Sequence, residues 1–177
     1  MIQPKRLVWD VEANGLLDTV TSIHCIVAKD IDTKEITRLY EETLKPDNII
    51  HLFENATKII CHNEISFDIP LLKMFYGINL IELLGKEAID DTYLWSKVLY
   101  PDRPMPKGCP SSIRNPVTNK AKKIGPHGLE SWGYRVGEKK VEIHDWRFFD
   151  EDMLNRCEID VEINEKVYYM LLEEANL

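Results

Sequence analysis

The order of the predicted strands and helices is the feature that most limits the fold of this chain. The first 42 residues contain three strand-like runs separated by short polar turns, and no helical pattern. The first run, "RLVWDVEA", is typical of a buried strand, and the "NG" that follows it marks a turn. Strands joined by short turns pair as an antiparallel meander. We therefore predict antiparallel strands over Arg6–Ala13, Ser22–Asp32 and Glu35–Glu42.

After this meander, strands alternate with helices. The apolar pattern predicts a helix over Ile49–Ala56, a strand over Thr57–Asn63, a helix over Ser66–Gly77, a short strand that continues as a helix within Glu87–Tyr100, and helices over His127–Gly137 and Asp150–Ala175. Ser66 and Asp150 are candidate N-caps, and Gly77 is a candidate helix terminator. Strands first, then alternating strands and helices, predict a mixed α/β or α+β sheet fold.

The length of 177 residues suits a single domain spanning residues 1–177. Residues 101–126 differ from the rest, because prolines recur there with glycine and serine and without a clear period. We interpret this segment as a long surface loop within the domain. The four cysteines form no CxxC pair, which favours reduced thiols in a cytosolic protein. A zinc site built from Cys61, His62 and Cys109 is an alternative without a recognisable spacing.

The charge balance excludes a typical basic nucleic-acid-binding module. With 22 basic and 30 acidic residues, the net charge is −8. A protein of this charge can bind nucleic acid only through a local basic patch or through bound metal cations. No apolar run approaches the roughly 20 residues of a membrane span, and the N-terminus lacks a signal-peptide layout. We therefore expect a cytoplasmic protein without a membrane partner.

Two carboxylates interrupt the first predicted strand. Asp10 and Glu12 are two residues apart in "LVWDVEA", and alternate residues of a strand share a face. Two like charges on one face of an apolar strand repel each other, and burying either is costly. Both carboxylates could reach solvent at the strand end. Alternatively, a divalent cation lies between them, since hard cations such as Mg²⁺ prefer oxygen ligands.

Two further aspartates have similar alternatives. Asp68 follows a predicted buried strand and lies at the start of a helix, where the helix dipole alone favours an acid. Asp160 lies within an apolar stripe of the last predicted helix, which consists of Met153, Cys157, Asp160, Asn164, Val167 and Leu171. A carboxylate facing inward needs a partner. That partner is a basic residue, with Arg156 on the adjacent turn the nearest choice, or a metal ion shared with Asp10 and Glu12.

Taken together, the four carboxylates indicate a two-metal site. Asp10, Glu12, Asp68 and Asp160 suffice to hold two divalent ions roughly 3.5–4 Å apart, an arrangement that catalyses in-line phosphoryl displacement. One ion lowers the pKa of an attacking water, and the other stabilises the leaving oxygen. Such a site also explains how an acidic protein could bind a phosphodiester.

The segments "WDVEANGLLD", "CHNEISFDIPLL" and "CEIDVEIN" resemble the three motifs of DEDD (DnaQ-like) 3′→5′ exonucleases. In addition, "AIDDTYLWSKVLYPD" and "GPHGLESWGYRVGEKK" are similar to segments of the proofreading domain of family A DNA polymerases from short-tailed bacteriophages. The resemblance covers most of the chain in the right order. It implies an RNase H-like α/β fold, a mixed sheet flanked by helices, and removal of nucleotides from a 3′ end with Mg²⁺ or Mn²⁺. The matching metal ligands are Asp10, Glu12, Asp68 and Asp160.

The same resemblance suggests residues that contact the substrate. Leu16 or Leu17 could wedge against the terminal base, although both could equally belong to the core. Asn63 and Phe67 could contact the last nucleotides, although Phe67 could simply pack under its helix. His127 matches a position of the phage segment but also suits a helix start. Asp91, which precedes Thr92 as in the phage polymerases, is interpreted as mainly structural.

Arg156 departs from the family pattern. The family usually has a tyrosine four residues before the last aspartate or a histidine five residues before it, where this chain has Arg156 and Asn155. Arginine stays protonated and cannot act as a general base. It could hold the scissile phosphate or stabilise its developing charge. His144 is a possible substitute base, although lone histidines usually have structural roles.

The remaining expectations concern the substrate and partners. Lys120, Lys122 and Lys123 in the predicted loop could guide single-stranded DNA or could be merely solvated, and no stacking platform of interleaved aromatics is evident. The resemblance implies a stand-alone exonuclease or the proofreading subunit of a split phage polymerase, acting in the host cytoplasm. Two alternatives stay open: a catalytically weakened nucleic-acid- or polymerase-binding module of the same fold, and an RNase.

Overall fold

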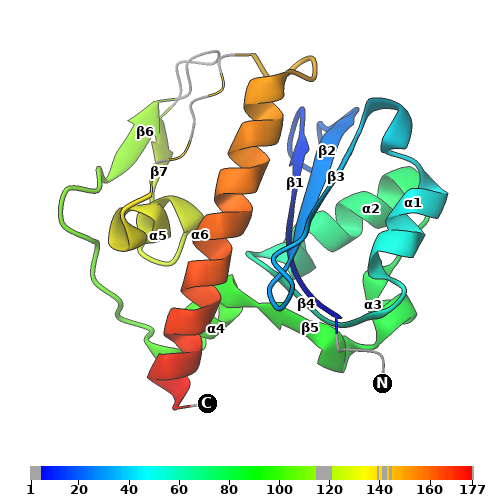
Figure 1. Cartoon of the computed structure of the whole chain (residues 1–177). Coiled ribbons are helices and arrows are strands. Elements are labelled where there is room, and N and C mark those ends of the chain that lie inside the picture. Colours follow the sequence, from blue (N-terminus) through cyan, green and yellow to red (C-terminus); the bar gives the residue numbers. More distant parts are fainter. Residues whose placement is uncertain (1–4, 115–120, 139, 141–142, 144, 177) are drawn as a thin grey trace.

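The computed structural model describes residues 5–114, 121–138, 140, 143 and 145–176, and its centre is a mixed five-stranded sheet (Figure 1). The strands are β1 (Lys5–Ala13), β2 (Ile23–Asp30), β3 (Ile36–Tyr40), β4 (Ala56–Cys61) and β5 (Ile89–Asp91), in the spatial order β3-β2-β1-β4-β5. Strands β1, β2 and β3 pair antiparallel, whereas β4 pairs parallel with both β1 and β5. The predicted meander and the mixed sheet are confirmed.

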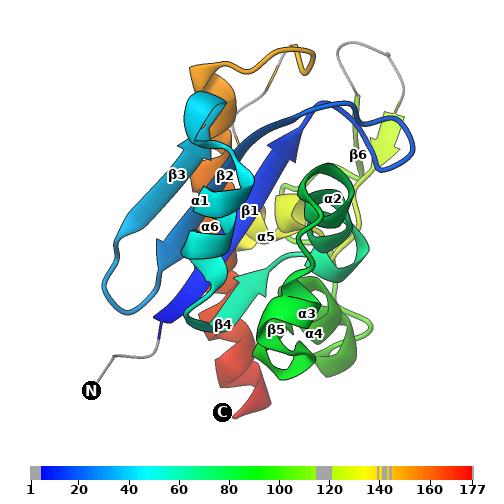
Figure 2. The same ribbon diagram turned by 90° about the vertical axis from the view of Figure 1, so that its right-hand side faces the viewer.

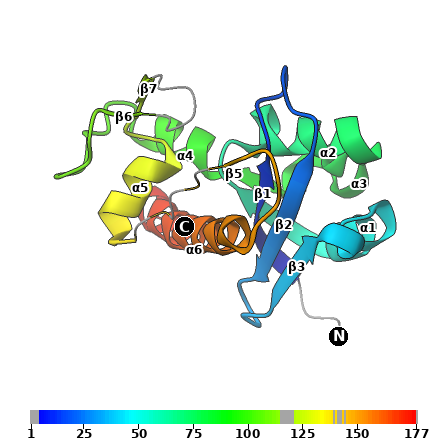
Figure 3. The same cartoon turned by 90° about the horizontal axis from the view of Figure 1, so that it is seen from above.

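Helices cover both faces of this sheet (Figures 1, 2 and 3). They are α1 (Pro46–Phe53), α2 (Asp68–Tyr76), α3 (Leu80–Leu84), α4 (Thr92–Leu99), α5 (Leu129–Val136) and α6 (Glu151–Ala175). Alternate residues of β1 serve the two faces: Trp9 packs in one core cluster with Phe53 of α1, and Val8 packs in a second with Val161 of α6. A strand buried on both sides needs an almost continuous apolar run, which explains "RLVW".

Local signals predicted several helix ends correctly. The Asp150 carboxylate accepts a hydrogen bond from the Met153 amide at 2.8 Å and caps α6, and Gly77 ends α2 in a left-handed conformation. The prediction that Ser66 caps α2 is wrong. Ser66 belongs to a 3₁₀ turn, Glu64–Ser66, and α2 begins only at Asp68. The short helix α3 was not predicted.

Part of the predicted loop at 101–126 has regular structure. Strands β6 (Ser112–Arg114) and β7 (Ala121–Lys123) form a separate antiparallel pair, on the far side of α6 from the main sheet (Figure 3). The Arg103 guanidinium lies 4.6 Å from the Trp132 ring of α5, and its Nη1 donates to Glu174 Oε1 at 2.8 Å. The start of this segment is therefore fastened to both α5 and α6.

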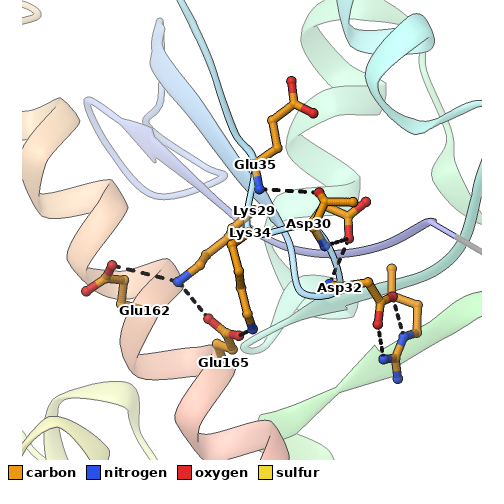
Figure 4. Close-up of polar contacts among 9 residues, drawn as sticks. Lys29, Asp30, Asp32, Lys34, Glu35, Glu162 and Glu165 are labelled. Atoms are coloured by element: carbon orange, nitrogen blue, oxygen red, sulfur yellow. Dashed lines mark hydrogen bonds and ion pairs between the residues drawn. The ribbon is translucent and has the colours of Figure 1, made fainter.

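Ion pairs join α6 to β2 and to the turn that follows β2 (Figure 4). Glu165 of α6 accepts from Lys34 at 2.6 Å and from Lys29 of β2 at 2.8 Å. Burial raises the pKa of Glu165, but the hydrogen bonds from the two lysines outweigh burial and leave this pKa below its ordinary value. Among the helices in the described ranges, none is both long and apolar enough to cross a bilayer.

Candidate metal centre

The carboxylates of the first motif meet α6. Asp10 and Glu12 lie on β1, with Asp10 half-buried and Glu12 9% exposed. Together with Asp160 they offer carboxylate oxygens that all lie within 4.8 Å of one another. Their common face follows from the two-residue period of β1, because both side chains leave the strand on the side that α6 covers.

Asp68 joins the same centre from the other side. It is the first residue of α2, which follows β4 after one 3₁₀ turn, and its carboxylate, the Cys61 thiol and the Asp10 carboxylate lie within 4.8 Å of one another. The connection is held by Asp91, whose carboxylate accepts from the Asn63 amide at 3.0 Å and caps α4 through the Tyr93 amide. Asp91 therefore fixes the backbone that carries Asp68.

Asp160 faces inward, as its helical stripe predicted. All six residues of the stripe are buried, and Asp160 is 4% exposed. Its basic partner is Lys140, whose Nζ donates to Asp160 Oδ2 at 2.6 Å. Asp160 Oδ1 is buried and lacks a hydrogen-bond partner within the part of the chain that the structure describes. One oxygen of this carboxylate is therefore available to a further ligand.

Arg156 is bound to a different carboxylate from the one suggested by sequence. Its Nε donates to Glu12 Oε1 at 3.1 Å, whereas the sequence suggested Asp160 as its partner. Lys140 was missed because it lies 20 residues before Asp160, outside the helix and without any spacing signal. Among the residues that the structure describes, the centre thus contains four carboxylates and two basic groups.

Burial and mutual repulsion dominate the electrostatics of the centre. Burial raises the pKa of Asp10 well above its ordinary value, and the charges of Asp160 and Glu12 raise it further. Burial, followed by the charge of Asp160, raises the pKa of Glu12 to about 7, although Arg156 and Lys140 oppose the shift. Burial likewise raises the pKa of Asp68 to about 7. Lys140 and Arg156 therefore do not fully compensate these acids.

The donor set fits divalent cations that prefer oxygen. Four carboxylates converge, their raised pKa values show a deficit of positive charge, and one Asp160 oxygen is unpartnered among the described residues. Asp10 belongs to both groups of candidate ligands, the one with Asp68 and the one with Glu12 and Asp160, which suits two neighbouring ions. The alternative zinc site is not assembled, because His62 Nδ1 lies 2.9 Å from Thr92 Oγ1 whereas Cys109 lies beside Ser131.

The predicted substrate contacts fall into different environments. Leu16 is 69% exposed, whereas Leu17 and Phe67 pack partly buried against the larger core cluster. Asn63 adopts a left-handed conformation just after β4, with φ of 71°. Lys122 and Lys123 are exposed on β7.

Two predicted residues lie outside the described ranges, namely Lys120 and His144. His127 is placed and has structural contacts. Its Nδ1 lies 2.8 Å from Ser96 Oγ, and its Nε2 lies 3.2 Å from the Pro101 carbonyl oxygen. Those contacts join α4 to the segment before α5, which supports the helix-start interpretation of His127.

The strand order, the helix α6 packed on β1 and β2, and the acids on β1 and after β4 identify the fold. The chain has the RNase H-like fold of the DEDD exonucleases. The NrnC protein of Brucella melitensis bound to pGG superposes with a TM-score of 0.65 at 15% identity, covering 98% of this chain and 74% of that one. Exonuclease I of E. coli in complex with a dT13 oligonucleotide superposes with a TM-score of 0.53 at 14% identity, covering 96% of this chain and 41% of that one.

RNase D of Trypanosoma brucei in complex with RNA U12 is a further structural neighbour. Its TM-score is 0.57 at 13% identity, and the match covers 96% of this chain and 56% of that one. At these identities the likeness concerns the fold.

By sequence, the chain is similar to the DNA-directed DNA polymerases of Escherichia phage T7 and Enterobacteria phage T3. Each is 28% identical over an alignment of 198 positions, gaps included, which covers 96% of this chain and 27% of the polymerase. The chain therefore spans about a quarter of the length of these relatives. No protein-family model matches it. The phage polymerases and the structural neighbours confirm the resemblance to DEDD exonucleases.

Proposed function

We propose that this protein is a metal-dependent 3′→5′ exonuclease that removes nucleotides from DNA 3′ ends. The observation that carries the proposal is the pair of ligand groups that share Asp10, because a shared carboxylate is what two adjacent divalent ions need. Asp10, Glu12 and Asp160 form one group. Asp68 completes the other, and the neighbouring Cys61 thiol donates to Asp68 Oδ2 at 3.4 Å.

The proposed cofactors are two Mg²⁺ or Mn²⁺ ions held by Asp10, Glu12, Asp68 and Asp160. When bound, such ions lower the pKa of an attacking water and stabilise charge on the leaving oxygen. NrnC, which shares the fold, has been solved with bound Mg²⁺. The raised pKa values of Glu12 and Asp68 mean that proton release accompanies occupation of this site near neutral pH.

The protein's own basic groups would bind the substrate. Arg156 is kept near the carboxylates by Glu12, and Lys140 by Asp160. A guanidinium or an ammonium cannot accept a proton from water at neutral pH, but either can donate hydrogen bonds to a phosphodiester oxygen. We assign Arg156 the role of holding the scissile phosphate. Leu16, exposed after β1, and Asn63, after β4, are proposed to contact the terminal nucleotides.

DNA is the proposed substrate because the relatives by sequence are DNA polymerases. The chain acts alone or as the proofreading subunit of a split phage polymerase, in the host cytoplasm. An RNase is the second candidate, because the fold is shared with an RNase D solved with RNA. A weakened binding module is the third, favoured by Arg156 and Asn155 at the positions where the resembling family carries a tyrosine or a histidine.

Release of mononucleotides from 3′-labelled single-stranded DNA tests the proposal. The wild-type chain is incubated with Mg²⁺, with Mn²⁺ or with EDTA, beside Asp10→Ala. We expect release with either metal and its loss in EDTA and in the variant. No release with either metal would overturn the exonuclease proposal, and release from a 5′ label before a 3′ label would reverse the direction. A matched RNA oligonucleotide decides between DNase and RNase.

A further inference from the structure

The segment Asp145–Asp150, "DWRFFD", directly precedes α6, and we call it the aromatic strap. It leads into α6 at the end of the sheet where β1 ends and β2 begins (Figures 1 and 3). Three of its six residues are aromatic, in a chain that is 9% aromatic. The metal centre uses none of these three rings as a ligand, so the strap needs an explanation of its own.

Both ends of the strap are fixed to the fold. The His24 ring, through Nε2, donates to the Trp146 carbonyl oxygen at 2.9 Å. The Phe149 ring stacks on the Tyr40 ring with centroids 5.4 Å apart and an interplanar angle of 19°. Asp150 caps α6. These anchors leave little conformational freedom for the two residues between Trp146 and Phe149.

Those two residues point out of the fold. Phe148 is 71% exposed, one of the most exposed large apolar side chains in the described ranges, although the next residue, Phe149, packs on Tyr40. The Arg147 guanidinium carbon lies 5.8 Å from the Phe148 ring centroid, and both its Nε and Nη2 donate to Asp145. The strap therefore presents to solvent an aromatic face and, beside it, an arginine that is paired with Asp145.

A pocket of about 340 Å³ lies beside this face. Its lining includes Phe148 and Phe149 of the strap, Ser22 and His24 of the β2 end, and Tyr76 at the end of α2. This volume is at the lower end of the range of pockets that hold small organic ligands. Glu41 and Arg147 also line it, so the lining carries one acid and one base beside its aromatic rings and suits a neutral aromatic group.

The strap also contacts the metal centre directly. The Arg156 guanidinium carbon lies 5.4 Å from the Trp146 ring centroid, and the Arg156 Nε binds Glu12. Phe148 follows Trp146 by two residues, which span at most about 7 Å of extended chain. The exposed Phe148 ring is thus within reach of a DNA strand whose 3′ end lies at the carboxylates.

We propose that Phe148, Arg147 and the adjoining pocket bind a nucleobase of single-stranded DNA, a few nucleotides from the 3′ end. The proposal rests on the proposed exonuclease function and names how its substrate strand is held. Every base has a π-face that stacks on an aromatic ring, and an arginine beside that ring attracts the backbone of the strand. The sequence shows no platform of interleaved aromatic residues for base stacking. We propose that the single exposed ring of the aromatic strap has this role.

Binding of labelled oligonucleotides in EDTA tests the subsite without cleavage. Fluorescence anisotropy compares the wild-type chain with Phe148→Ala and with Val98→Ala, which truncates a 79% exposed apolar side chain on α4. We expect Phe148→Ala to weaken binding about 5-fold or more, the usual cost of losing one base–aromatic stack, and Val98→Ala to leave binding unchanged. Equal affinity of the two variants would overturn the proposal.

A walk of single abasic positions along the same oligonucleotide locates the base. In the wild-type chain, one position near the 3′ end should weaken binding when its base is removed, and this penalty should vanish in Phe148→Ala. An unchanged pattern of penalties in the variant contradicts the subsite, as does a failure of the wild-type chain to bind in both EDTA and Ca²⁺. The exonuclease proposal fails separately, if the wild-type chain binds DNA but releases no nucleotide with Mg²⁺ or Mn²⁺.

Discussion

Helix α6 carries two buried acids, Glu165 and Asp160, whose surroundings differ in how negative charge is balanced. Glu165 lies near the C-terminal half and accepts from both Lys29 and Lys34, and its pKa is lowered. Asp160 lies one and a half turns earlier and shares its surroundings with Asp10 and Glu12, whose pKa values are raised. A protein can satisfy buried carboxylates with its own lysines, and at Glu165 this one does.

The difference teaches what the second group is for. Lys140 and Arg156 already contribute two positive charges to the metal centre, yet burial and repulsion still hold Asp10, Glu12 and Asp68 above their ordinary pKa values. An acid group left short of positive charge in the folded protein costs stability, and such a cost is common where function requires it. We infer that Glu165 belongs to the architecture of the fold and the four acids to its chemistry.

The largest predicted effect separates activity from stability. Asp10→Asn should reduce nucleotide release by at least about 100-fold, because a metal ligand shared by both ion positions is lost. The same variant should melt at a higher temperature than the wild-type chain at pH 8 in EDTA, because a repelled buried charge is removed. A nuclease assay and a thermal melt on the same preparation check both. A variant that is inactive but also less stable would show that Asp10, like Glu165, has a structural role.

The metal-free protein should lose stability as pH rises. The folded pKa values of Glu12 and Asp68 are about 7, above the ordinary values of 4.5 and 3.8, so the folded state holds protons that the unfolded chain releases. This stabilisation is complete below the ordinary values and disappears as pH rises through about 7, a change on the order of 3–4 kcal/mol for each group.

Thermal melts in EDTA from pH 5 to pH 8 measure this change, and Mn²⁺ should raise the melting temperature more at pH 8 than at pH 5.5. A melting temperature in EDTA that rises steadily over this range would show that the acids of the metal centre are already compensated.

Glu165 should respond in the opposite sense. Glu165→Gln removes the negative charge that pairs with two lysines and replaces one acceptor oxygen by an NH₂ donor, and we expect a loss of about 1–2 kcal/mol in the free energy of unfolding with nuclease activity retained. Urea denaturation at pH 7 measures the loss. Glu162→Gln is the matched control, because Glu162 is half exposed and lies 3.8 Å from Lys29 Nζ, and its cost should stay under about 0.5 kcal/mol. Equal effects of the two variants would remove the contrast on which the comparison depends.

The smallest predicted effect concerns Arg156. Arg156→Tyr should raise activity a few-fold, because a phenol hydroxyl can orient a water molecule whereas a guanidinium cannot accept its proton. Loss of Arg156 also removes a group that lowers the pKa of Glu12, so the acidic limb of the pH–rate profile should move to higher pH. Arg156→Met should move this limb without raising activity. If the tyrosine variant is inactive, loss of the contact between Arg156 and the phosphate outweighs any gain from an oriented water molecule.

Features set by local chemistry could be predicted from the sequence. The cap at Asp150, the end of α2 at Gly77 and the inward position of Asp160 depend on neighbours within a few residues. The Ser66 cap was wrong because a 3₁₀ turn took up that residue before α2 began. This turn is fixed from outside by Asp91, which lies on β5 and is distant in sequence.

Contacts between distant segments could not be predicted in the same way. The pairing of Lys140 with Asp160 and of Arg156 with Glu12 depends on how α6 lies on β1, and no spacing in the sequence records it. The aromatic strap was visible as "DWRFFD", but which ring packs and which is exposed depends on contacts with His24 and Tyr40. The missed features are thus the ones that tertiary structure creates.

The central claim is that Asp10, Glu12, Asp68 and Asp160 bind two divalent ions side by side. Titration of the metal-free protein with Mn²⁺, followed by calorimetry and electron paramagnetic resonance, tests it most directly. We predict two Mn²⁺ per chain with a spin-coupled signal, and at most one uncoupled ion in Asp10→Asn. No bound Mn²⁺, or a single uncoupled ion in the wild-type chain, would contradict the two-metal account.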